Sequence, residues 1–299
     1  MNGYRSRHEE LTVPVAGGAL TVLRWPAADP AAPVVLAVHG ITANGLAWSE
    51  VAGALAGRVT LLAPDLRGRG ASRTLGGPYG LARHADDMAE LISALGLGPT
   101  VLAGHSMGAW IAALTAVRHP ALVRRLLLVD GAVSLPLPAG VPPQDALAAV
   151  LGPALARLSM SFADRDAYRT FWRKHPAFGG AWSSAIEAYI QRDLIGAEPE
   201  LRSSCVLEAV RADGAEVLLD PDAAAAVHRL PCTAELLLAE RGLLDEAQAL
   251  YDEERIAAAG LDPDRVTSAA FVPDTNHYSI LRGGRGADTV ARRLLGAAG

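Results

Sequence analysis

The chain has 299 residues, of which 51% are hydrophobic, with 27 basic and 32 acidic side chains and a formal net charge of −5. Such a chain can bury one large core, and its basic residues form no stripe that would favour nucleic acid or an anionic membrane as a partner. Neither the N-terminal residues nor any other stretch has the uncharged apolar length of a secretory signal or a bilayer span, so we expect a cytoplasmic protein.

The predicted strands and helices alternate after an opening hairpin. Residues 11–15 and 20–25 flank Gly17-Gly18, which predicts the hairpin. Apolar strand-like runs then alternate with helical segments, beginning near Val34, Val59, Val101, Leu126, Ala234 and Ala269. Continuous apolar strands separated by helices predict an α/β fold, with a mostly parallel central sheet covered by helices on both faces.

The loop after the strand predicted at 34–38 starts with His39-Gly40. Because Gly40 has no side chain, a substrate could approach the backbone there, and the N–H of Ile41 is a candidate donor to a developing oxyanion. An ordinary turn from a strand into a loop is the alternative. His39, Gly40 and the later Trp48 are candidate pocket residues, although Trp48 could instead pack against the sheet.

The helix predicted over 81–95 has apolar residues on one face and carries two adjacent carboxylates, Asp86 and Asp87. A pair of acids can bind a metal ion, but on a helix it more often belongs to a solvated face. We therefore expect neither a metal nor a cofactor.

The most informative motif is Gly104-His105-Ser106-Met107-Gly108, between the apolar run 101–103 and the helical run 109–117. A strand that turns this sharply into a helix strains the backbone at Ser106, and the flanking glycines leave the room that the turn needs. The hydroxyl of Ser106 is then a candidate nucleophile, and the N–H of Met107, in the first helical turn, is the second candidate oxyanion donor. A plain glycine-rich turn is the alternative. His105 and Trp110 are further candidate pocket residues.

A serine hydroxyl needs a base, and His277 follows the terminal apolar run 269–272 in a polar loop. The base in turn needs a carboxylate at the end of another strand. We prefer Asp245, which follows the run 234–239 after a glycine-containing turn and keeps the chain order serine, aspartate, histidine. Asp130, after the run 126–129, keeps the same order and is the alternative, with Glu240 as a weaker one.

Together these segments resemble the α/β-hydrolase superfamily. The resemblance covers about two thirds of the chain and rests on His39-Gly40, residues 64–72, residues 104–108, residues 242–245 and Asn276-His277. It implies that Ser106, Asp245 and His277 form a catalytic triad and that the turn 64–72 is structural. The superfamily often has glycine where this chain has Asn276.

Between residues 130 and 231 the strand rhythm stops, and we predict a helical cap over 134–230, inserted between the core segments 1–133 and 231–299. A proline-rich stretch opens it, and helix-like segments follow at 145–158, 164–174 and 182–194. Its aromatic side chains are expected mainly to form the cap's own core, with Trp172 and Trp182 as candidates for a substrate pocket. Three cations could contact an acidic substrate but are more typical of a solvated helix face, namely Arg169, Arg173 and Lys174.

We therefore predict a serine hydrolase that cleaves carboxylic esters, with a small ester-like molecule as its partner. Lactone, thioester or carbon–carbon bond hydrolysis and cofactor-free haloperoxidase or perhydrolase activity are alternatives that the resemblance implies. A ligand-binding receptor with little turnover is an alternative from another class. Cys205 and Cys232 could pair in an oxidising compartment, but they lack metal-ligand spacing and are expected to be buried free thiols. The sequence predicts no oligomeric state.

Overall fold

The structure is a computed structural model that describes residues 8–135, 140, 145, 152–178 and 182–299. Most of the proline-rich stretch predicted to open the cap, and residues 146–151 of the helix predicted at 145–158, lie outside the described residues.

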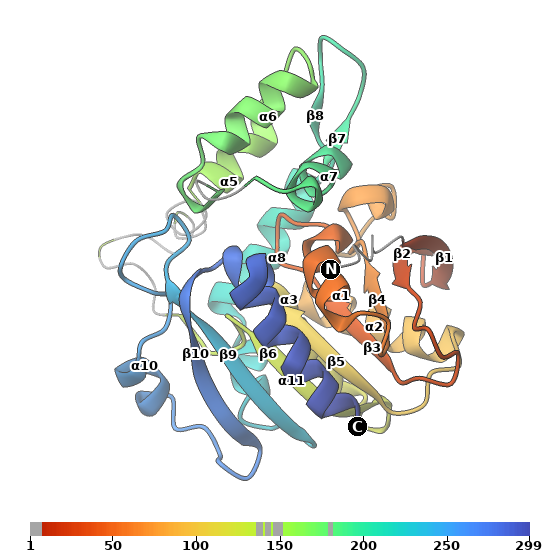
Figure 1. Cartoon of the computed structure of the whole chain (residues 1–299), viewed down its shortest axis with the longest axis vertical. Helices are drawn as coiled ribbons and strands as arrows, with labels where there is room; N and C mark the ends of the chain where they lie inside the picture. The colour runs from red at the N-terminus through yellow and green to blue at the C-terminus, as the bar shows by residue number, and fades with distance from the viewer. Residues whose placement is uncertain (1–7, 136–139, 141–144, 146–151, 179–181) are drawn as a thin grey trace.

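The core is built on a sheet of eight strands in the order β1-β2-β4-β3-β5-β6-β9-β10 (Figure 1). The hairpin is antiparallel, with Val15 opposite Gly18, and β2 pairs antiparallel with β4, while all the other neighbours are parallel. The strands are β1 Glu9–Val15, β2 Gly18–Trp25, β3 Val34–Val38, β4 Thr60–Pro64, β5 Thr100–His105, β6 Val123–Val129, β9 Thr233–Arg241 and β10 Val266–Asn276. The predicted hairpin and mostly parallel sheet are confirmed.

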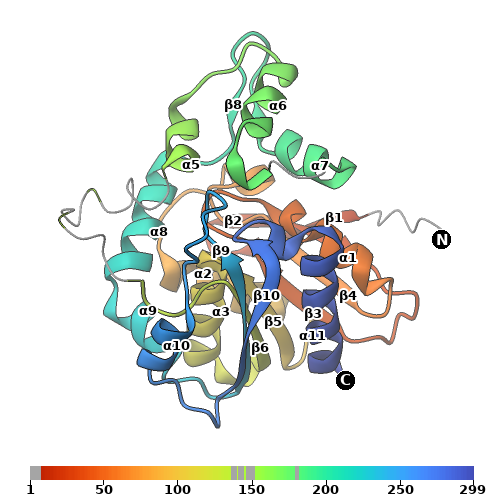
Figure 2. The ribbon, with the colours of Figure 1, turned by 60° about the vertical axis from the view of Figure 1, so that its left-hand side comes forward.

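Side chains alternate between the two faces of the sheet, as strand geometry requires. In β3, Leu36 and Val38 belong to one hydrophobic cluster, and Val35 and Ala37 belong to the other. Figure 2 shows α1 and α11 on one side of the sheet and α2, α3, α8 and α9 on the other. These helices are α1 Ser49–Leu55, α2 Leu81–Ala94, α3 Met107–Arg118, α8 Leu207–Leu219, α9 Pro221–Ala226 and α11 Asp288–Ala298, with α10 Glu253–Ala258 beyond β9.

Between β6 and β9 the chain forms a group of small elements that stand above the sheet, which we call the cap elements (Figure 1). They are α5 Pro153–Ala156, η4 Arg157–Ser159, α6 Arg165–Arg173, η5 Pro176–Phe178, α7 Ser184–Arg192, β7 Leu194–Ile195 and β8 Arg202–Ser203. Asp164 and Ser183 cap α6 and α7 by accepting from the N–H groups of Ala167 and Ile186. Helices α8 and α9 then return to the core and pack against α2 and α3. The predicted insertion 134–230 thus contains the cap elements and two helices of the core layer.

Asp65, in the turn that follows β4, joins the core to the cap elements. Its buried carboxylate accepts from the N–H groups of Gly45 and Ala71, both at 2.8 Å, and pairs with Arg192 of α7 at 2.7 Å. Hydrogen bonds from several donors compensate a carboxylate for the water that it loses on burial. These contacts agree with the structural role that the resemblance implies for the turn 64–72.

The prediction of a solvated acidic pair on α2 is wrong for one of its two members. Asp86 is partly exposed and pairs with Arg118 at 2.9 Å, whereas Asp87 is fully buried and pairs with Arg67 at 2.7 Å. The periodicity of the helix could not show this, because Arg67 comes from a different segment of the chain, the turn 64–72. Among the described residues, no three side chains of His, Cys, Asp or Glu gather as metal ligands would.

Both cysteines are free thiols, and Cys205 is buried. Burial raises the pKa of Cys205 to about 11, so its thiol is protonated at neutral pH. No helix in the described part of the chain has the length and apolarity needed to cross a membrane.

Candidate active site

Ser106 lies on a strained turn between β5, which ends at His105, and α3, which begins at Met107. Its φ of 54° and ψ of −130° lie outside the regions that side chains favour. A Cβ on Gly104 would lie 2.0 Å from the carbonyl oxygen of Gly108, and a Cβ on Gly108 would lie 2.3 Å from that of Val38. Glycine is therefore required at both positions, and the predicted sharp turn is confirmed.

The structure pairs His277 with Asp130. Nδ1 of His277 lies 2.6 Å from Oδ2 of Asp130, and both side chains are buried. The other carboxylate oxygen of Asp130 accepts from the N–H of Ala239 at 3.0 Å. Asp130 follows β6, which is the sheet neighbour of the strand that carries Ser106. The carboxylate thus reaches the histidine from the strand next to the serine.

The structure does not bring the preferred acid, Asp245, into contact with His277. Its carboxylate accepts from Nδ2 of Asn276 at 2.8 Å and pairs with Arg241, and its side chain is 29% exposed. Asn276, where the superfamily often has glycine, stabilises the loop of His277 through its side chain. Its side-chain oxygen accepts from the N–H groups of Tyr278 and Ser279 at 3.0 and 2.8 Å. These bonds close the turn that carries the histidine, and the remaining amide group holds Asp245 away from it.

His105 holds the backbone of His277 in position. Its Nε2 donates to the backbone oxygen of His277 at 2.7 Å, and the two ring centroids lie 4.7 Å apart. Burial, followed by the nearby His277, lowers the pKa of His105 well below its ordinary value. His105 is therefore neutral and acts as a fixed hydrogen-bond donor.

The loop after β3 is fixed on its core side. The ring of His39 accepts from the N–H of Leu66 at 3.0 Å and donates to the carbonyl oxygen of Gly40 at 2.7 Å. Burial lowers the pKa of His39 to about 4, which keeps the ring neutral. Arg69 donates to the carbonyl oxygen of Ile41 at 3.0 Å and so orients that peptide.

The cap elements hold the same loop from the other side. Asn44 donates to the carbonyl oxygen of Tyr189 in α7 at 3.0 Å, and Arg157 donates to that of Thr42 at 3.1 Å. The loop that carries one candidate oxyanion donor is thus clamped between the core and the cap elements.

The candidate oxyanion donors flank Ser106. A Cβ on Gly40 would lie 3.1 Å from the Cβ of Ser106, so the backbone before Ile41 comes close to the serine. Met107 is the first residue of α3, where backbone N–H groups lack partners within the helix. Among the described residues, neither the Ile41 nor the Met107 N–H donates to a protein acceptor.

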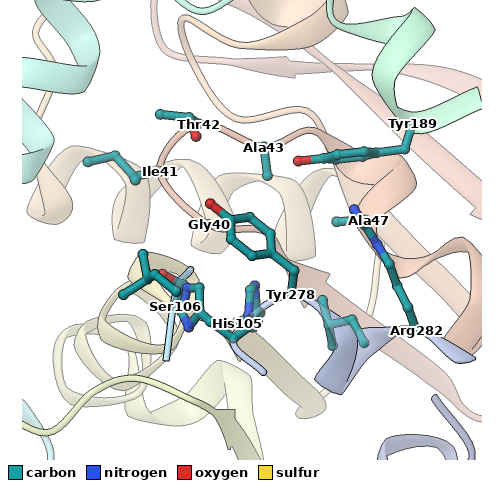
Figure 3. A pocket seen from close by; sticks show the side chains of 13 residues that line it. Gly40, Ile41, Thr42, Ala43, Ala47, His105, Ser106, Tyr189, Tyr278 and Arg282 are labelled. Carbon is teal, nitrogen blue, oxygen red and sulfur yellow. Dashed lines mark hydrogen bonds between the residues drawn. The ribbon is translucent and has the colours of Figure 1, made fainter. Parts of the chain in front are cut away.

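Two cavities meet at Ser106 and His277, and they share Ile41 and Leu243 as well. The first, which we call the Arg282 cavity (Figure 3), encloses about 500 Å³, part of it open to solvent, and is lined by these four residues and by Gly40, Thr42, Ala43, Ala47, His105, Tyr189, Tyr278, Leu281 and Arg282. The second, which we call the Trp110 cavity, has about 490 Å³ of empty space, part of it open to solvent. It is lined further by Met107, Trp110, Asp130, Leu135, Gly214, Val217, Leu218 and Leu250. A scissile bond at Ser106 would therefore have one substituent in each cavity.

Three of the predicted pocket residues line these cavities, namely Gly40, His105 and Trp110. His39 does not, because its ring faces the core and holds the loop. Trp48 is fully buried in the cluster beneath α1.

Trp172 and Trp182 also miss the described cavity walls. Trp172 packs inside the cap elements under Arg157, whose guanidinium carbon is 5.1 Å from the ring centroid. Trp182 donates to Glu187 at 3.1 Å, and Arg173 lies over its ring. Both tryptophans therefore belong to the cap's own structure, and neither lines the two cavities as was expected of them.

The sequence interpretation missed Tyr189, Tyr278 and Arg282 as cavity residues. Tyr278 and Arg282 follow His277 in the same loop, so their positions were a usable signal. Tyr189 is one of many cap aromatics, and nothing in its spacing distinguishes it.

Known proteins resemble this chain in sequence and in fold. The sequence model described as "Alpha/beta hydrolase family" matches residues 34–292. An uncharacterised protein of Mycobacterium tuberculosis is 40% identical over 98 residues, 33% of this chain and 29% of that protein. The 2-(acetamidomethylene)succinate hydrolase of Mesorhizobium japonicum is 38% identical over 98 residues, 33% of this chain and 35% of that protein. Lipase LipV of Mycobacterium tuberculosis is 36% identical over 116 residues, 39% of this chain and 43% of that protein. The match thus spans less than half the length of these relatives.

Solved structures resemble the whole chain. The crystal structure of E-2-(acetamidomethylene)succinate hydrolase superposes with a TM-score of 0.77 at 23% identity, over 97% of this chain and 98% of that one. The thioesterase domain from the curacin biosynthetic pathway superposes with a TM-score of 0.73 at 22% identity, over 97% of this chain and 99% of that one. At such identities the similarity shows the fold alone.

Proposed function

Because this chain belongs to the alpha/beta hydrolase family, we propose that it is a serine hydrolase that cleaves carboxylic esters through an acyl-enzyme on Ser106. One observation carries the proposal. His277, hydrogen-bonded to buried Asp130, lines the same two cavities as a serine held on a strained turn. A nucleophile, a base and a group that orients the base are the parts that acyl transfer requires.

In the first step, Oγ of Ser106 attacks the ester carbonyl carbon while Nε2 of His277 takes the hydroxyl proton. Asp130 accepts from Nδ1–H, which leaves Nε2 free to act as the base and stabilises the imidazolium that forms. Ser106 and His277, both among the described residues, line the same cavity but form no hydrogen bond with each other. Such a bond is often absent until substrate binds.

The charge that develops on the carbonyl oxygen is taken up by the N–H groups of Ile41 and Met107, each worth about 3 kcal/mol of barrier. As the carbon–oxygen bond of the ester breaks, His277 returns its proton to the departing alkoxide, which leaves as the alcohol. Water then attacks the acyl-enzyme, with His277 again as the base, and the acid is released while Ser106 regains its proton.

The test is the initial rate on p-nitrophenyl esters of increasing acyl length. Wild type should turn over at least one chain length, and Ser106→Ala should lower kcat by about four to six powers of ten. Ser93→Ala is the matched control, because Ser93 is exposed on α2. A fluorophosphonate probe that modifies serine nucleophiles should label wild type at Ser106, as located by mass spectrometry.

A kcat of the Ser106→Ala variant within tenfold of the wild-type value would reject the proposal. A probe that labels the protein at residues other than Ser106 would also reject it. Serine-dependent turnover of lactones or thioesters in place of simple esters would keep the mechanism and change the substrate class.

A further inference from the structure

Arg282 enters the cavity beside the candidate nucleophile from the loop that carries His277. Its guanidinium carbon lies 4.5 Å from the ring centroids of both Phe178 and Tyr189. Figure 3 shows the side chain reaching past Ala47 toward the ring of Tyr189. Stacking on two rings fixes the position of a guanidinium and leaves its N–H edges available to a planar acceptor.

Arg282 is partly buried, and it differs from the fully buried arginines because each of those has a carboxylate partner. Arg67 pairs with Asp87 at 2.7 Å and Arg69 with Asp213 at 2.5 Å, while Arg157 pairs with Asp193. No carboxylate of the described residues lies within ion-pair distance of Arg282, and the remaining residues include no Asp or Glu.

Among the largest influences on the pKa of Arg282, the acidic one is Glu50. Its carboxylate is already used, because it accepts from Oγ of Ser183 at 2.7 Å and from the N–H of Gly283 at 2.6 Å. Burial lowers the pKa of Arg282, although the nearby Tyr189 and Glu50 act in the opposite direction. For Arg157, by contrast, burial is opposed by Asp193 together with Tyr168 and other neighbours, and the net effect raises the pKa well above its ordinary value. Partial burial removes some of the water around the guanidinium of Arg282, and a carboxylate supplied by a ligand would compensate for that loss.

Two hydroxyl groups accompany the guanidinium in the Arg282 cavity. Figure 3 shows the Tyr189 and Tyr278 hydroxyls directed into the cavity. Burial raises the pKa of both tyrosines, so both stay protonated and can donate. One cation and two O–H donors match the lone pairs of a carboxylate.

We infer that the substrate carries a free carboxylate, which Arg282 binds in the Arg282 cavity while the scissile ester lies at Ser106 and an apolar group occupies the Trp110 cavity. This inference rests on the proposed serine hydrolase function. The walls of the second cavity support it, because Trp110, Val217 and Leu250 offer an apolar group a matching surface. A short half-ester of a dicarboxylic acid has these features.

The test compares monobutyl succinate with its neutral primary amide, which has nearly the same shape, and measures released butanol by chromatography. The reversed ester, 4-butanoyloxybutanoate, and its amide test the carboxylate on the alcohol side. For at least one of the two pairs, wild type should favour the acid over the amide by about ten- to hundredfold in kcat/KM, the range of a charge-assisted hydrogen bond.

Arg282→Met keeps much of the side-chain length without the charge, and the preference should fall to about one, chiefly through a higher KM for the acid. Arg282→Lys should retain part of the preference. The matched control is Arg285→Met, because Arg285 is 59% exposed and pairs with Asp274. It should keep the wild-type preference.

A second measurement needs no variant. Succinate should inhibit wild-type hydrolysis of neutral p-nitrophenyl acetate competitively, and succinamide should not. Equal kcat/KM values for acid and amide in both pairs, or equal inhibition by succinate and succinamide, would overturn the carboxylate inference while Ser106-dependent turnover upheld the hydrolase. Absence of any Ser106-dependent turnover, with no probe labelling at Ser106, would instead overturn the hydrolase and the inference with it.

Discussion

Asparagine in place of Asp130 is the change that tests the site most directly. Asp130 accepts two hydrogen bonds, one from Nδ1 of His277 at 2.6 Å and one from the N–H of Ala239 at 3.0 Å. An asparagine that still accepts from Ala239 must turn its amide NH₂ toward the histidine. The imidazole then carries its proton on Nε2, where it cannot accept a proton from Ser106.

The alternative orientation of the new amide places NH₂ against the N–H of Ala239, which leaves buried donors unsatisfied at a cost of about 1–3 kcal/mol. We therefore expect Asp130→Asn to lower kcat by about three to four powers of ten, or about 4–5.5 kcal/mol of barrier. Asp245→Asn should lower kcat less than tenfold, because it removes a partly exposed pair with Arg241 and leaves an amide oxygen that can still accept from Asn276.

The assay is the rate on the best p-nitrophenyl ester for wild type and both variants, with thermal unfolding measured to show that all three are folded. A larger loss from Asp245→Asn than from Asp130→Asn would refute the assignment of the orienting acid. Comparable losses from both, with both folded, would refute the argument from exposure.

Three further outcomes are expected. Gly104→Ala should abolish soluble folded protein, because its Cβ would lie 2.0 Å from a backbone oxygen, whereas Gly53→Ala, with nothing within 4 Å, should leave the melting temperature unchanged or higher. His105→Phe should lower kcat about tenfold by removing the donor to His277, and His105→Gln should lower it less, as steady-state rates on a neutral ester would show. His39 takes up its proton near pH 6.5 when unfolded but only at about pH 4 when folded, so its contribution to stability should be lost as the pH falls between these values, by about 2 kcal/mol at pH 5. The urea midpoint at pH 7 and pH 5 measures this, and His39→Gln should be less sensitive to pH than wild type.

The turn at Ser106 could be predicted because its causes are local. Two glycines, an apolar strand and a helical run are contiguous in the chain, and the short distances that require glycine arise within that segment and the adjacent β3. The strands were equally predictable, because buried parallel strands are continuous apolar runs.

The orienting acid could not be chosen because Asp130 and Asp245 both keep the right chain order. What separates them is a contact of long range, since the amide of Asn276 occupies the carboxylate of Asp245. Arg282 was missed for a related reason. Whether Arg282 has a carboxylate partner depends on every residue that surrounds it in the fold. Two of these residues, Phe178 and Tyr189, come from the cap elements, so the spacing of residues in the sequence could not predict it.

The clamp on the loop after β3 links substrate fit to reaction rate. The contacts of Asn44 and Thr42 with the cap elements hold the segment next to Ile41, whose N–H is to stabilise the transition state. A molecule that displaces α7 would also move the N–H of Ile41 away from the position in which it can donate to the oxyanion. Poor substrates are therefore expected to bind and yet react slowly even at saturation, so that discrimination among them is expressed in kcat more than in KM.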